Sequence, residues 1–389
     1  MKIMKTLTMA LLLTLIIIST FASGCMESST SPHDINTQEQ IATFTVTDAL
    51  GRIVEVPQSP EYVICSGSGA LRYLTYLEAQ DKIVAVDSIE TRESKFDARP
   101  YALANPQFKE YPVFGEFRGN DNPEKILTLD PQPQVIFKMY SASGYDPAEL
   151  QKKTGIPVIA LNYGDMVSNR ADMYQSLRSM GQVMGKEDRA EEVISFFDTA
   201  ISDLNGRTAD VPEEEKITCY VGGIARSGPH GFQSTEPTYP PFTFTNANNV
   251  AYDPKNLSTA DVSKESILGW DPQIIFVDLS TTQSEDKSSA LYQLQNDASY
   301  IKLTAVKTGE VYGVLPYNWY TQNHGSVLSD AYFAGKLLYP ERFNDVDLED
   351  KTIEIYTFLV GRGDDEVGRQ VYEEMINAFS VPAFTKLDV

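Results

Sequence analysis

Cysteine and histidine are scarce in this sequence, which contains three of each in 389 residues. Cys65 and Cys219 each lie in an apolar run, EYVIC and KITCYV, and this setting favours buried free thiols over a disulfide. His230 and His324 have no second or third ligand at the spacing of a metal site. The sequence therefore argues against a bare zinc or manganese centre, and any bound metal should arrive already chelated.

The short motifs of hydrolases are missing. The chain contains neither Gly-x-Ser-x-Gly nor His-Glu-x-x-His, and three histidines leave few general bases. The segment GSGALR has two glycines of a dinucleotide-binding fingerprint and lacks the third. We therefore expect no catalytic residues, although a secreted hydrolase remains an alternative class. A surface adhesion protein is a further alternative, and it predicts repeats without a cleft.

Basic residues are too few to balance the acidic ones. The chain has 32 Lys and Arg against 54 Asp and Glu, which gives a formal net charge of −22 at pH 7. A chain of this charge repels nucleic acid and anionic lipid headgroups, so neither is an expected partner. A solvated surface suited to a salty environment explains the acidity without reference to any ligand.

An apolar run from Leu7 to Gly24 follows two lysines and precedes Cys25. A basic start, an apolar segment and small residues before a cleavage point are typical of a signal peptide. The residues ASGC resemble a lipoprotein signal box, in which the cysteine becomes the lipidated first residue. This interpretation makes residues 1–24 a signal peptide and residues 25–42 a flexible tether. The alternative is a single transmembrane anchor, because the run is near the minimum length for one span.

Strand-like and helix-like segments alternate along most of the remaining chain. FTVTDALGRIVEVP predicts a hairpin, EYVICSG and KIVAVD predict strands, and ALRYLTYLEAQ predicts a helix. After Asn169 two helical segments follow one another, and the second, KEDRAEEVISFFDTAISDLNGR, has an apolar face. The alternation resumes at ITCYVGG, and the helices SVLSDAYFAGKLLYP and KTIEIYTFLVG close the chain. This pattern predicts an N-terminal α/β lobe over 43–170, a helical connector over 171–207 and a C-terminal α/β lobe over 215–380.

Two stretches nearly repeat each other, NPEKILTLDPQPQVIF and SKESILGWDPQIIFVD. In each, a helix N-cap, Asn122 or Ser263, precedes a glutamate in the first turn, Glu124 or Glu265. An Asp-Pro pair and an apolar strand follow. A carboxylate in the first turn stabilises a helix through its dipole by roughly 0.3–1 kcal/mol. Taken alone, the pattern is explained by helix stability and needs no partner.

The ASGC box, the hairpin with VICSGSGALRYLTYLEAQDKIVAVD, the repeated Glu-x-Ile-Leu units and the long central helix form one pattern. Together they resemble the substrate-binding lipoproteins of ABC importers for iron-siderophore complexes, haem and cobalamin, from about Thr43 to Met375. The resemblance implies an α/β fold of two lobes, each a small, mainly parallel sheet flanked by helices. One long rigid α-helix joins the lobes, and the ligand cleft lies between them. It also implies that Glu124 and Glu265, one on each lobe, dock arginines of the membrane permease.

In parallel α/β lobes a ligand meets the loops that follow the carboxyl ends of strands. Arg118 and Arg226 in such loops suit an anionic chelate, because a guanidinium can donate two hydrogen bonds to one carboxylate or catecholate group. Two aromatic loops, TYPPFTFTNANN and PYNWYTQNH, either line the cleft or pack on their own lobe. The same rule also selects Asp278 and Tyr320. The candidate ligand-binding residues are Ser66, Ser68, Gly69, Phe117, Arg118, Lys138, Tyr140, Tyr163, Arg226, His230, Tyr317, Trp319 and Asn323.

The chain is thus predicted to be a non-catalytic, monomeric receptor outside the cell membrane, held there by a lipid on Cys25. We expect it to capture a metal chelate, first of all a ferric siderophore, and to deliver it to an ABC permease dimer with its ATPase. It needs no cofactor of its own, and its ligand is chelated iron(III) or a corrinoid. Haem or cobalamin binding within the same importer class is the alternative, and an oxyanion complex stays open. A single stiff helix between lobes should allow only small closure.

The lipid anchor leads to a test. We expect Cys25→Ala to lack the lipid and to appear in the soluble fraction, because the predicted cleavage before position 25 removes the apolar run. Membrane fractionation and an intact mass measure both properties. A variant that stays membrane-bound with the apolar run attached would show that the run is a transmembrane anchor.

Overall fold

The loops that matter for function are positioned by two parallel β-sheets. The computed structural model describes residues 42–94, 97–139, 143–283 and 287–389. The predicted signal peptide, Cys25 and Tyr140 lie outside these residues. Within the described part of the chain, no helix combines the length and the apolar composition needed to cross a membrane.

The N-terminal lobe is built on a six-stranded sheet in the order β6-β5-β4-β3-β7-β8. All neighbouring strands are parallel except β5 and β6, which pair antiparallel. The predicted hairpin, β1 (Thr43–Thr47) and β2 (Ile53–Pro57), forms a separate antiparallel pair. The strands of the large sheet are β3 (Val63–Ser66), β4 (Ile83–Asp87), β5 (Val113–Glu116), β6 (Asn120–Asp121), β7 (Val135–Met139) and β8 (Val158–Leu161).

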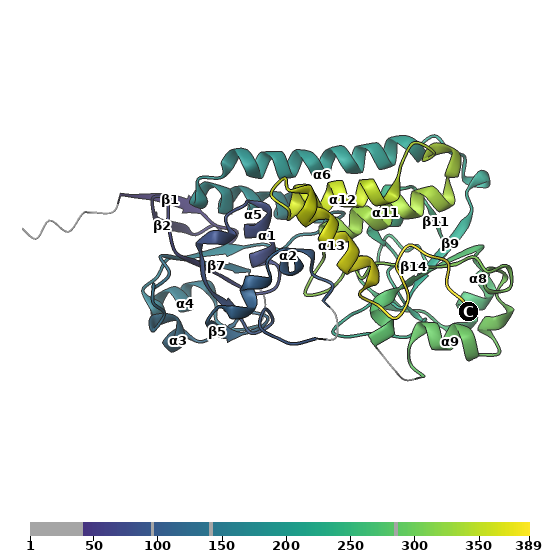
Figure 1. Cartoon of the computed structure of the whole chain (residues 1–389), viewed down its shortest axis with the longest axis horizontal. Helices are drawn as coiled ribbons and strands as arrows, with labels where there is room; N and C mark the ends of the chain where they lie inside the picture. The colour runs from purple at the N-terminus through teal and green to yellow at the C-terminus, as the bar shows by residue number, and fades with distance from the viewer. Residues whose placement is uncertain (1–41, 95–96, 140–142, 284–286) are drawn as a thin grey trace, which may run out of the picture. The chain divides into compact units, whose positions relative to one another are not determined.

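Helices cover both faces of this sheet, which is why its central strands are apolar on both sides. Alternate residues of β3 face opposite sides: Ile64 packs in one apolar cluster with Ile126 and Leu150, whereas Val63 and Cys65 pack in the other. Ile126 belongs to α3 and Leu150 to α4, and Figure 1 shows these two helices below the sheet and α1 above it. The helices are α1 (Ala70–Tyr76), α2 (Pro100–Leu103), α3 (Pro123–Leu127) and α4 (Pro147–Thr154), with 3₁₀ turns η1 (Gln80–Lys82) and η2 (Pro106–Glu110).

Two local expectations have different outcomes. Both predicted N-caps are confirmed: Asn122 accepts a hydrogen bond from the Lys125 N–H, and Ser263 accepts one from the Ser266 N–H. The helix predicted over ALRYLTYLEAQ, by contrast, ends at Tyr76. Glu78 has a φ of 55°, and this left-handed conformation cannot continue an α-helix.

The central helical segments form α5 (Arg170–Met184) and α6 (Glu187–Thr208), as the sequence predicts. Gly185, at φ 62°, ends α5 in the left-handed conformation that glycine adopts without strain. With 22 residues, α6 is about 33 Å long. In Figure 1 it runs from the side of the first sheet to the side of the second. Its buried face includes Val193, Phe197 and Leu204.

The C-terminal lobe contains a four-stranded parallel sheet in the order β11-β9-β13-β14. A short antiparallel pair, β10 with β12, lies beside it. The strands are β9 (Thr218–Gly222), β10 (Ser234–Thr235), β11 (Asn248–Asn249), β12 (Ala260–Asp261), β13 (Ile274–Asp278) and β14 (Val311–Val314). The helices around them are η3 (Glu213–Glu215), α7 (Pro240–Phe244), α8 (Lys264–Trp270), η4 (Leu279–Gln283), α9 (Ala290–Asn296), η5 (Tyr300–Lys302) and α10 (Thr304–Thr308).

Three helices follow the last strand, so the expectation that two helices close the chain is wrong. They are α11 (His324–Leu338), α12 (Leu348–Leu359) and α13 (Asp365–Asn377), with η6 (Pro340–Arg342) between the first two. The unforeseen helix, α13, has Asp364 as its N-cap and buries Val371 and Met375. Its polar composition and short apolar stripe conceal it in the sequence.

The cores contain two buried thiols and one notable carboxyl group. Cys65 and Cys219 are free and buried, as predicted, and burial raises the pKa of both thiols. Asp278, at the end of β13, is 1% exposed. Its Oδ1 accepts the Ser280 N–H at 2.8 Å, and its Oδ2 has no hydrogen-bond partner among the described residues. Burial raises the pKa of Asp278 to about 7.

This raised pKa makes the stability of the protein depend on pH. Between about pH 4 and pH 7 the unfolded Asp278 ionises while the folded one resists, so the contribution of Asp278 to the free energy of unfolding falls as the pH rises. Asp278→Asn keeps the Oδ1 acceptor and cannot ionise. We expect the variant to gain up to about 1.4 kcal/mol per pH unit over the wild type across this window.

Urea unfolding at pH 5 and pH 8 measures the difference. Asp81→Asn, at an exposed position, controls for the chemical change. A stability difference between Asp278→Asn and the wild type that is equal at both pH values would contradict the expectation.

Candidate functional site

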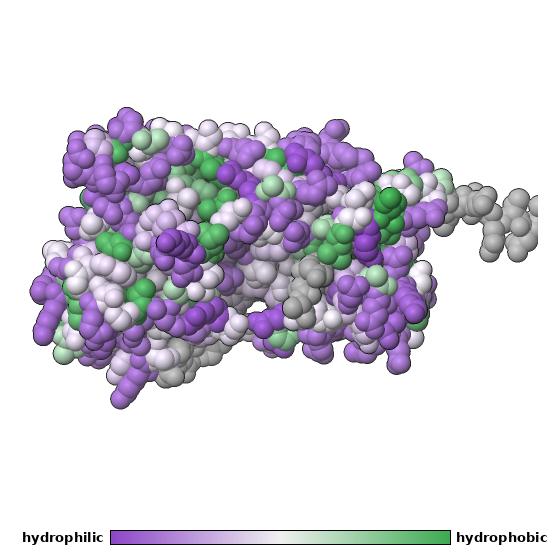
Figure 2. All heavy atoms as spheres, turned by 180° about the vertical axis from the view of Figure 1, so that it is seen from behind, coloured by the Kyte–Doolittle hydropathy of each residue, from purple (hydrophilic) through white to green (hydrophobic). Residues whose placement is uncertain are grey.

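A cavity of about 490 Å³ opens where loops of the two lobes meet. Figure 2 shows the surface hollowed between the lobes. The loops that form the cavity follow the carboxyl ends of β3, β4, β5, β9 and β14, as the strand-end rule predicts. The lining residues are Ser68, Ile89, Phe117, Arg118, Ala225, Arg226, Ser227, Gly228, Asn318, Trp319, Tyr320 and Thr321.

Five candidates from the sequence come together in this cavity. Arg118 reaches it from the N-terminal lobe and Arg226 from the C-terminal lobe. Ser68, Phe117 and Trp319 complete the group. Ile89, whose apolar side chain carries no chemical signal, was not among the residues that the strand-end rule selected. Ala225 and Asn318 lie in segments that the rule selected, but neither was named as a candidate. Two cationic side chains from opposite lobes therefore share one opening, and their role toward a ligand stays a prediction.

Phe117 stacks between two exposed arginines at the N-terminal side of the cavity. The guanidinium carbons of Arg92 and Arg118 lie 4.4 and 5.2 Å from its ring centroid. The Arg118 main-chain N–H donates to the Tyr320 hydroxyl at 3.0 Å, and Arg118 has a φ of 64°. Within the described residues Arg118 forms no ion pair. Its charge is thus available to an incoming anion.

Arg226 has a different environment on the opposite side. Its guanidinium forms an ion pair with Asp261, and the two side chains are 39% and 55% exposed. The His230 Nε2 lies within hydrogen-bond distance, 2.8 Å, of the main-chain oxygen of Arg226, and this contact stabilises the loop that follows β9. His230 itself does not line the cavity. The Asn318 amide donates to the Ala225 carbonyl at 3.0 Å and joins the two C-terminal loops. An anion that binds Arg226 must share it with Asp261.

Lys138 and Ser66 lie beneath the cavity wall and not on it. Lys138 is 1% exposed, and its ammonium is 2.5 Å from Asp121 Oδ2 and 3.0 Å from the Gly119 carbonyl. The Ser66 hydroxyl donates to the other oxygen of Asp121. The strand-end rule placed the charge of Lys138 near the opening. The structure instead neutralises that charge in a buried pair.

Three further candidates serve the packing of the lobes. Tyr317 is 1% exposed and lies edge-on to Tyr239, with ring centroids 5.4 Å apart. Gly69, at φ 95°, precedes α1, and a Cβ there would collide with the ring of Tyr163. The Tyr163 hydroxyl donates to the Gln322 carbonyl at 2.7 Å. These residues hold the loops in place, and none of them lines the cavity.

The lobes are joined beside the cavity by Arg72 of α1, a residue that the strand-end rule did not select. Arg72 is 1% exposed and donates to Thr321 Oγ1 at 2.9 Å and to Asn323 Oδ1 at 2.8 Å. It also donates to the Tyr320 carbonyl at 3.1 Å and to the Trp319 carbonyl at 3.3 Å. The only hint in the sequence is an arginine within an otherwise apolar and aromatic helix, ALRYLTYL.

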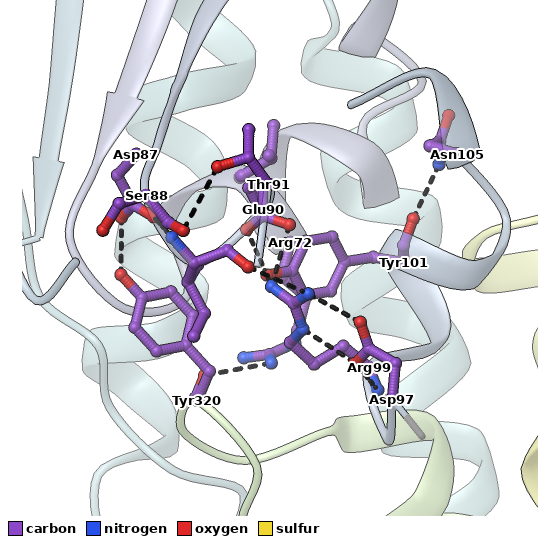
Figure 3. A network of polar contacts seen from close by, with 12 residues as sticks. Arg72, Asp87, Ser88, Glu90, Thr91, Asp97, Arg99, Tyr101, Asn105 and Tyr320 are labelled. Atoms are coloured by element: carbon purple, nitrogen blue, oxygen red, sulfur yellow. Dashed lines mark hydrogen bonds and ion pairs between the residues drawn. The ribbon is translucent and has the colours of Figure 1, made fainter. Parts of the chain in front are cut away.

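Tyr320 makes a second connection, which is visible in Figure 3. Its hydroxyl donates to Asp87 Oδ2 at 2.5 Å. Asp87 is 4% exposed, and burial, with a contribution from the charge of Glu90, raises the pKa of Asp87 to about 7. Beneath it, Arg99 binds Glu90 at 2.8 Å and Asp97 at 2.6 Å. A buried polar network of the N-terminal lobe thus supports the cavity wall.

The repeated glutamates lie away from the cavity. Glu124 and Glu265 are exposed in the first turns of α3 and α8, and neither forms an ion pair among the described residues. Glu124 lines a surface pocket of about 590 Å³ with Lys125, Tyr145 and Lys153. That pocket is larger than the cavity between the lobes. Elements of the N-terminal lobe alone form it, namely β5, β6, α3 and α4 with their connections, whereas loops of both lobes line the other cavity.

Metal-ligating side chains do not gather anywhere in the described part of the chain. No group of three or more His, Cys, Asp or Glu residues there is arranged to hold a metal ion.

Comparisons with known proteins agree with this architecture. Residues 63–317 match the family described as periplasmic binding protein. The molybdate-binding protein MolA of Haemophilus influenzae is 25% identical over 342 residues, which cover 81% of this chain and 90% of that protein. Its molybdate-bound structure is similar with a TM-score of 0.63, at 22% identity over 82% of this chain and 98% of that chain.

A periplasmic solute binding protein from Veillonella parvula is similar in structure with a TM-score of 0.64. It is 22% identical and covers 82% of this chain and 93% of that chain. The ABC transporter substrate-binding lipoprotein YvrC of Bacillus subtilis, whose name calls it uncharacterized, is 20% identical in sequence over 85% of this chain and 97% of that protein.

The matched region exceeds half of the chain and contains both sheets. The predicted fold class is confirmed, and so is the expectation of a binding protein in place of an enzyme, because the family and its relatives bind solutes. The chain therefore belongs to the periplasmic binding protein family.

Proposed function

We propose that this protein captures an anionic metal chelate, with a ferric siderophore as the favoured ligand, and delivers it to an ABC permease. The observation that carries the proposal is the meeting of Arg118 and Arg226, one from each lobe, in a single open cavity. Charge-assisted hydrogen bonds from guanidinium groups are strong and match carboxylate and catecholate oxygens in geometry. A chelate bound there would contact both lobes at once.

The size and lining of the cavity favour a chelate over a small oxyanion. A volume of about 490 Å³ lies in the range of small-molecule sites and far exceeds that of one tetrahedral oxyanion. Ile89, Phe117, Ala225 and Trp319 contribute apolar and aromatic surface, which suits the rings of a chelator and not a bare anion. Molybdate is the second candidate, because the relative with 25% identity is a molybdate-binding protein.

The cavity arginines can be tested by titration calorimetry with ferric siderophores. We expect Arg118→Ala to weaken binding by roughly 1.5–3 kcal/mol, the range for hydrogen bonds to charged groups. Arg226→Ala should weaken it less, because Asp261 already holds part of that charge. Asp261→Asn should tighten binding for the same reason. Arg369→Ala, on the exposed face of α13, is the control.

Two outcomes would overturn the assignment of the ligand. Full affinity in both arginine variants, with loss only in Trp319→Ala, would mean that stacking holds a flat macrocycle such as haem or a corrinoid. Binding of molybdate by the wild type, with no affinity for any ferric chelate, would favour the oxyanion.

The same proposal assigns a docking role to the two glutamates. Glu124 and Glu265 project from matching places on the two lobes, and both carboxylates are exposed. A permease made of two equal halves can offer one cation to each.

We also propose the organisation of the whole chain. The lobes are residues 43–170 and 215–380, and residues 171–207 connect them. A lipid on Cys25 anchors the protein to the membrane, and the protein works as a monomer.

Replacement of both glutamates tests the docking role. We expect Glu124→Ala with Glu265→Ala to abolish uptake of the ligand, because both contacts with the permease are lost. Ligand affinity and melting temperature should change little, since exposed charges contribute at most about 1 kcal/mol to folding. Uptake of radiolabelled chelate by cells measures the effect.

The matched control is Glu187→Ala with Glu349→Ala, which removes exposed first-turn glutamates from α6 and α12. Normal uptake in the Glu124 and Glu265 double variant would exclude the docking role.

A further inference from the structure

We infer that Arg72 is a positioning residue for the ligand. It binds the segment Trp319–Asn323, which belongs to the C-terminal part of the chain, to the N-terminal lobe, and it thereby holds the side chains of Trp319 and Tyr320 on the cavity wall. The inference rests on the proposed function only in taking the cavity as the ligand site. The geometry of the wall itself is independent of which ligand binds.

Four of the five hydrogen bonds of Arg72 go to this one segment, and the fifth goes to the Tyr163 hydroxyl at 3.3 Å. Two of its acceptors are the main-chain carbonyls of Trp319 and Tyr320, and two are the side-chain oxygens of Thr321 and Asn323. Figure 3 shows Arg72 lying between Tyr320 and Tyr101, and its guanidinium carbon is 5.0 Å from the Tyr101 ring centroid. Contacts with four successive or near-successive residues fix the path of the segment and not just one point on it.

The chemistry of the site requires a guanidinium. The planar fork of arginine presents five N–H donors in fixed directions, whereas lysine has a compact ammonium that cannot reach acceptors so widely spaced. These four acceptors of Arg72 are neutral oxygens. Burial of a charge costs free energy unless many hydrogen bonds compensate for it. The full set of contacts is therefore needed to keep Arg72 in this position.

The segment would not keep its conformation without such support. Tyr320 and Thr321 are consecutive residues with φ of 52° and 67°. A non-glycine residue in the left-handed region is strained, and it persists only where surrounding contacts hold it. Other contacts with the N-terminal lobe assist Arg72. The Tyr163 hydroxyl donates to the Gln322 carbonyl at 2.7 Å, and the Asn323 amide donates to the Ala98 carbonyl at 2.8 Å. The Tyr320 hydroxyl donates to Asp87 and accepts the Arg118 N–H, as described above. This part of the cavity wall thus belongs to the C-terminal part of the chain, and residues of the N-terminal lobe hold its conformation.

Tryptophan fluorescence can read the position of the wall without any ligand. The chain has two tryptophans, so Trp270→Phe leaves Trp319 as the sole emitter. In this background we compare Arg72→Gln with Arg189→Gln. Arg189 is the matched control, because its side chain also joins separate segments through the main-chain carbonyls of Tyr76 and Phe358, away from the cavity.

We expect Arg72→Gln to raise the iodide quenching constant of Trp319 at least about twofold and to weaken affinity for ferric tris(catecholate) about tenfold, or roughly 1.4 kcal/mol. Arg189→Gln should lower the melting temperature and leave both quenching and affinity unchanged. Arg72→Lys retains the charge and loses the fork, so it should also raise quenching. It provides the test if Arg72→Gln does not fold.

Quenching of Trp319 that is the same in the Arg72 and Arg189 variants would overturn the positioning role, even where chelate binding is intact. Raised quenching in the Arg72 variants, in a protein whose wild type binds no chelate, would support the positioning role and refute the proposed ligand. The two ideas therefore fail separately.

Discussion

The hydrogen bonds of one buried guanidinium connect the lobes where the cavity lies. Arg72 reaches across from α1 to the segment that follows β14, and the cavity wall takes its shape from that contact. Because the acceptors are main-chain and side-chain oxygens spread over Trp319–Asn323, the segment behaves as part of the N-terminal lobe. The strand-end loops of both sheets can then form one preformed site.

The lobes are also joined at the start of α11, and the charge state of His324 makes this possible. His324 is fully buried, and its ring stacks with those of Tyr73 and Tyr163 at centroid distances of 5.8 and 6.1 Å. Burial, together with the charge of Arg72, holds the pKa of His324 well below its usual range. The neutral ring can therefore lie near Arg72 without repulsion.

Positively charged side chains line the cavity, although the chain as a whole is strongly acidic. A net charge of −22 opposes an anionic ligand at long range. The cavity nevertheless displays Arg118 without a carboxylate partner among the described residues, and Arg226 with only a partly exposed one. Lys138, by contrast, is neutralised by Asp121. Under the proposed function, these local positive groups would attract an anionic ligand, while the acidic surface would repel unspecific polyanions.

The sequence by itself determined most of the elements and their order, although it did not reveal α13 or the early end of α1. The hairpin, the apolar strands, the long α6 and the caps Asn122 and Ser263 depend on neighbouring residues, whose periodicity and capping chemistry are written locally. The strand-end rule also predicted that Arg118, Arg226 and Trp319 lie at one opening, and they line the same cavity because parallel strands end together.

Only the tertiary structure decided which polar side chains face the cavity and which are buried and paired with other groups inside the protein. Lys138 meets Asp121, and Arg72 meets Thr321 in the segment after β14, at a sequence separation of 249. No local pattern encodes such pairs, because a buried charge is satisfied by whatever acceptors the packed fold brings within about 3 Å.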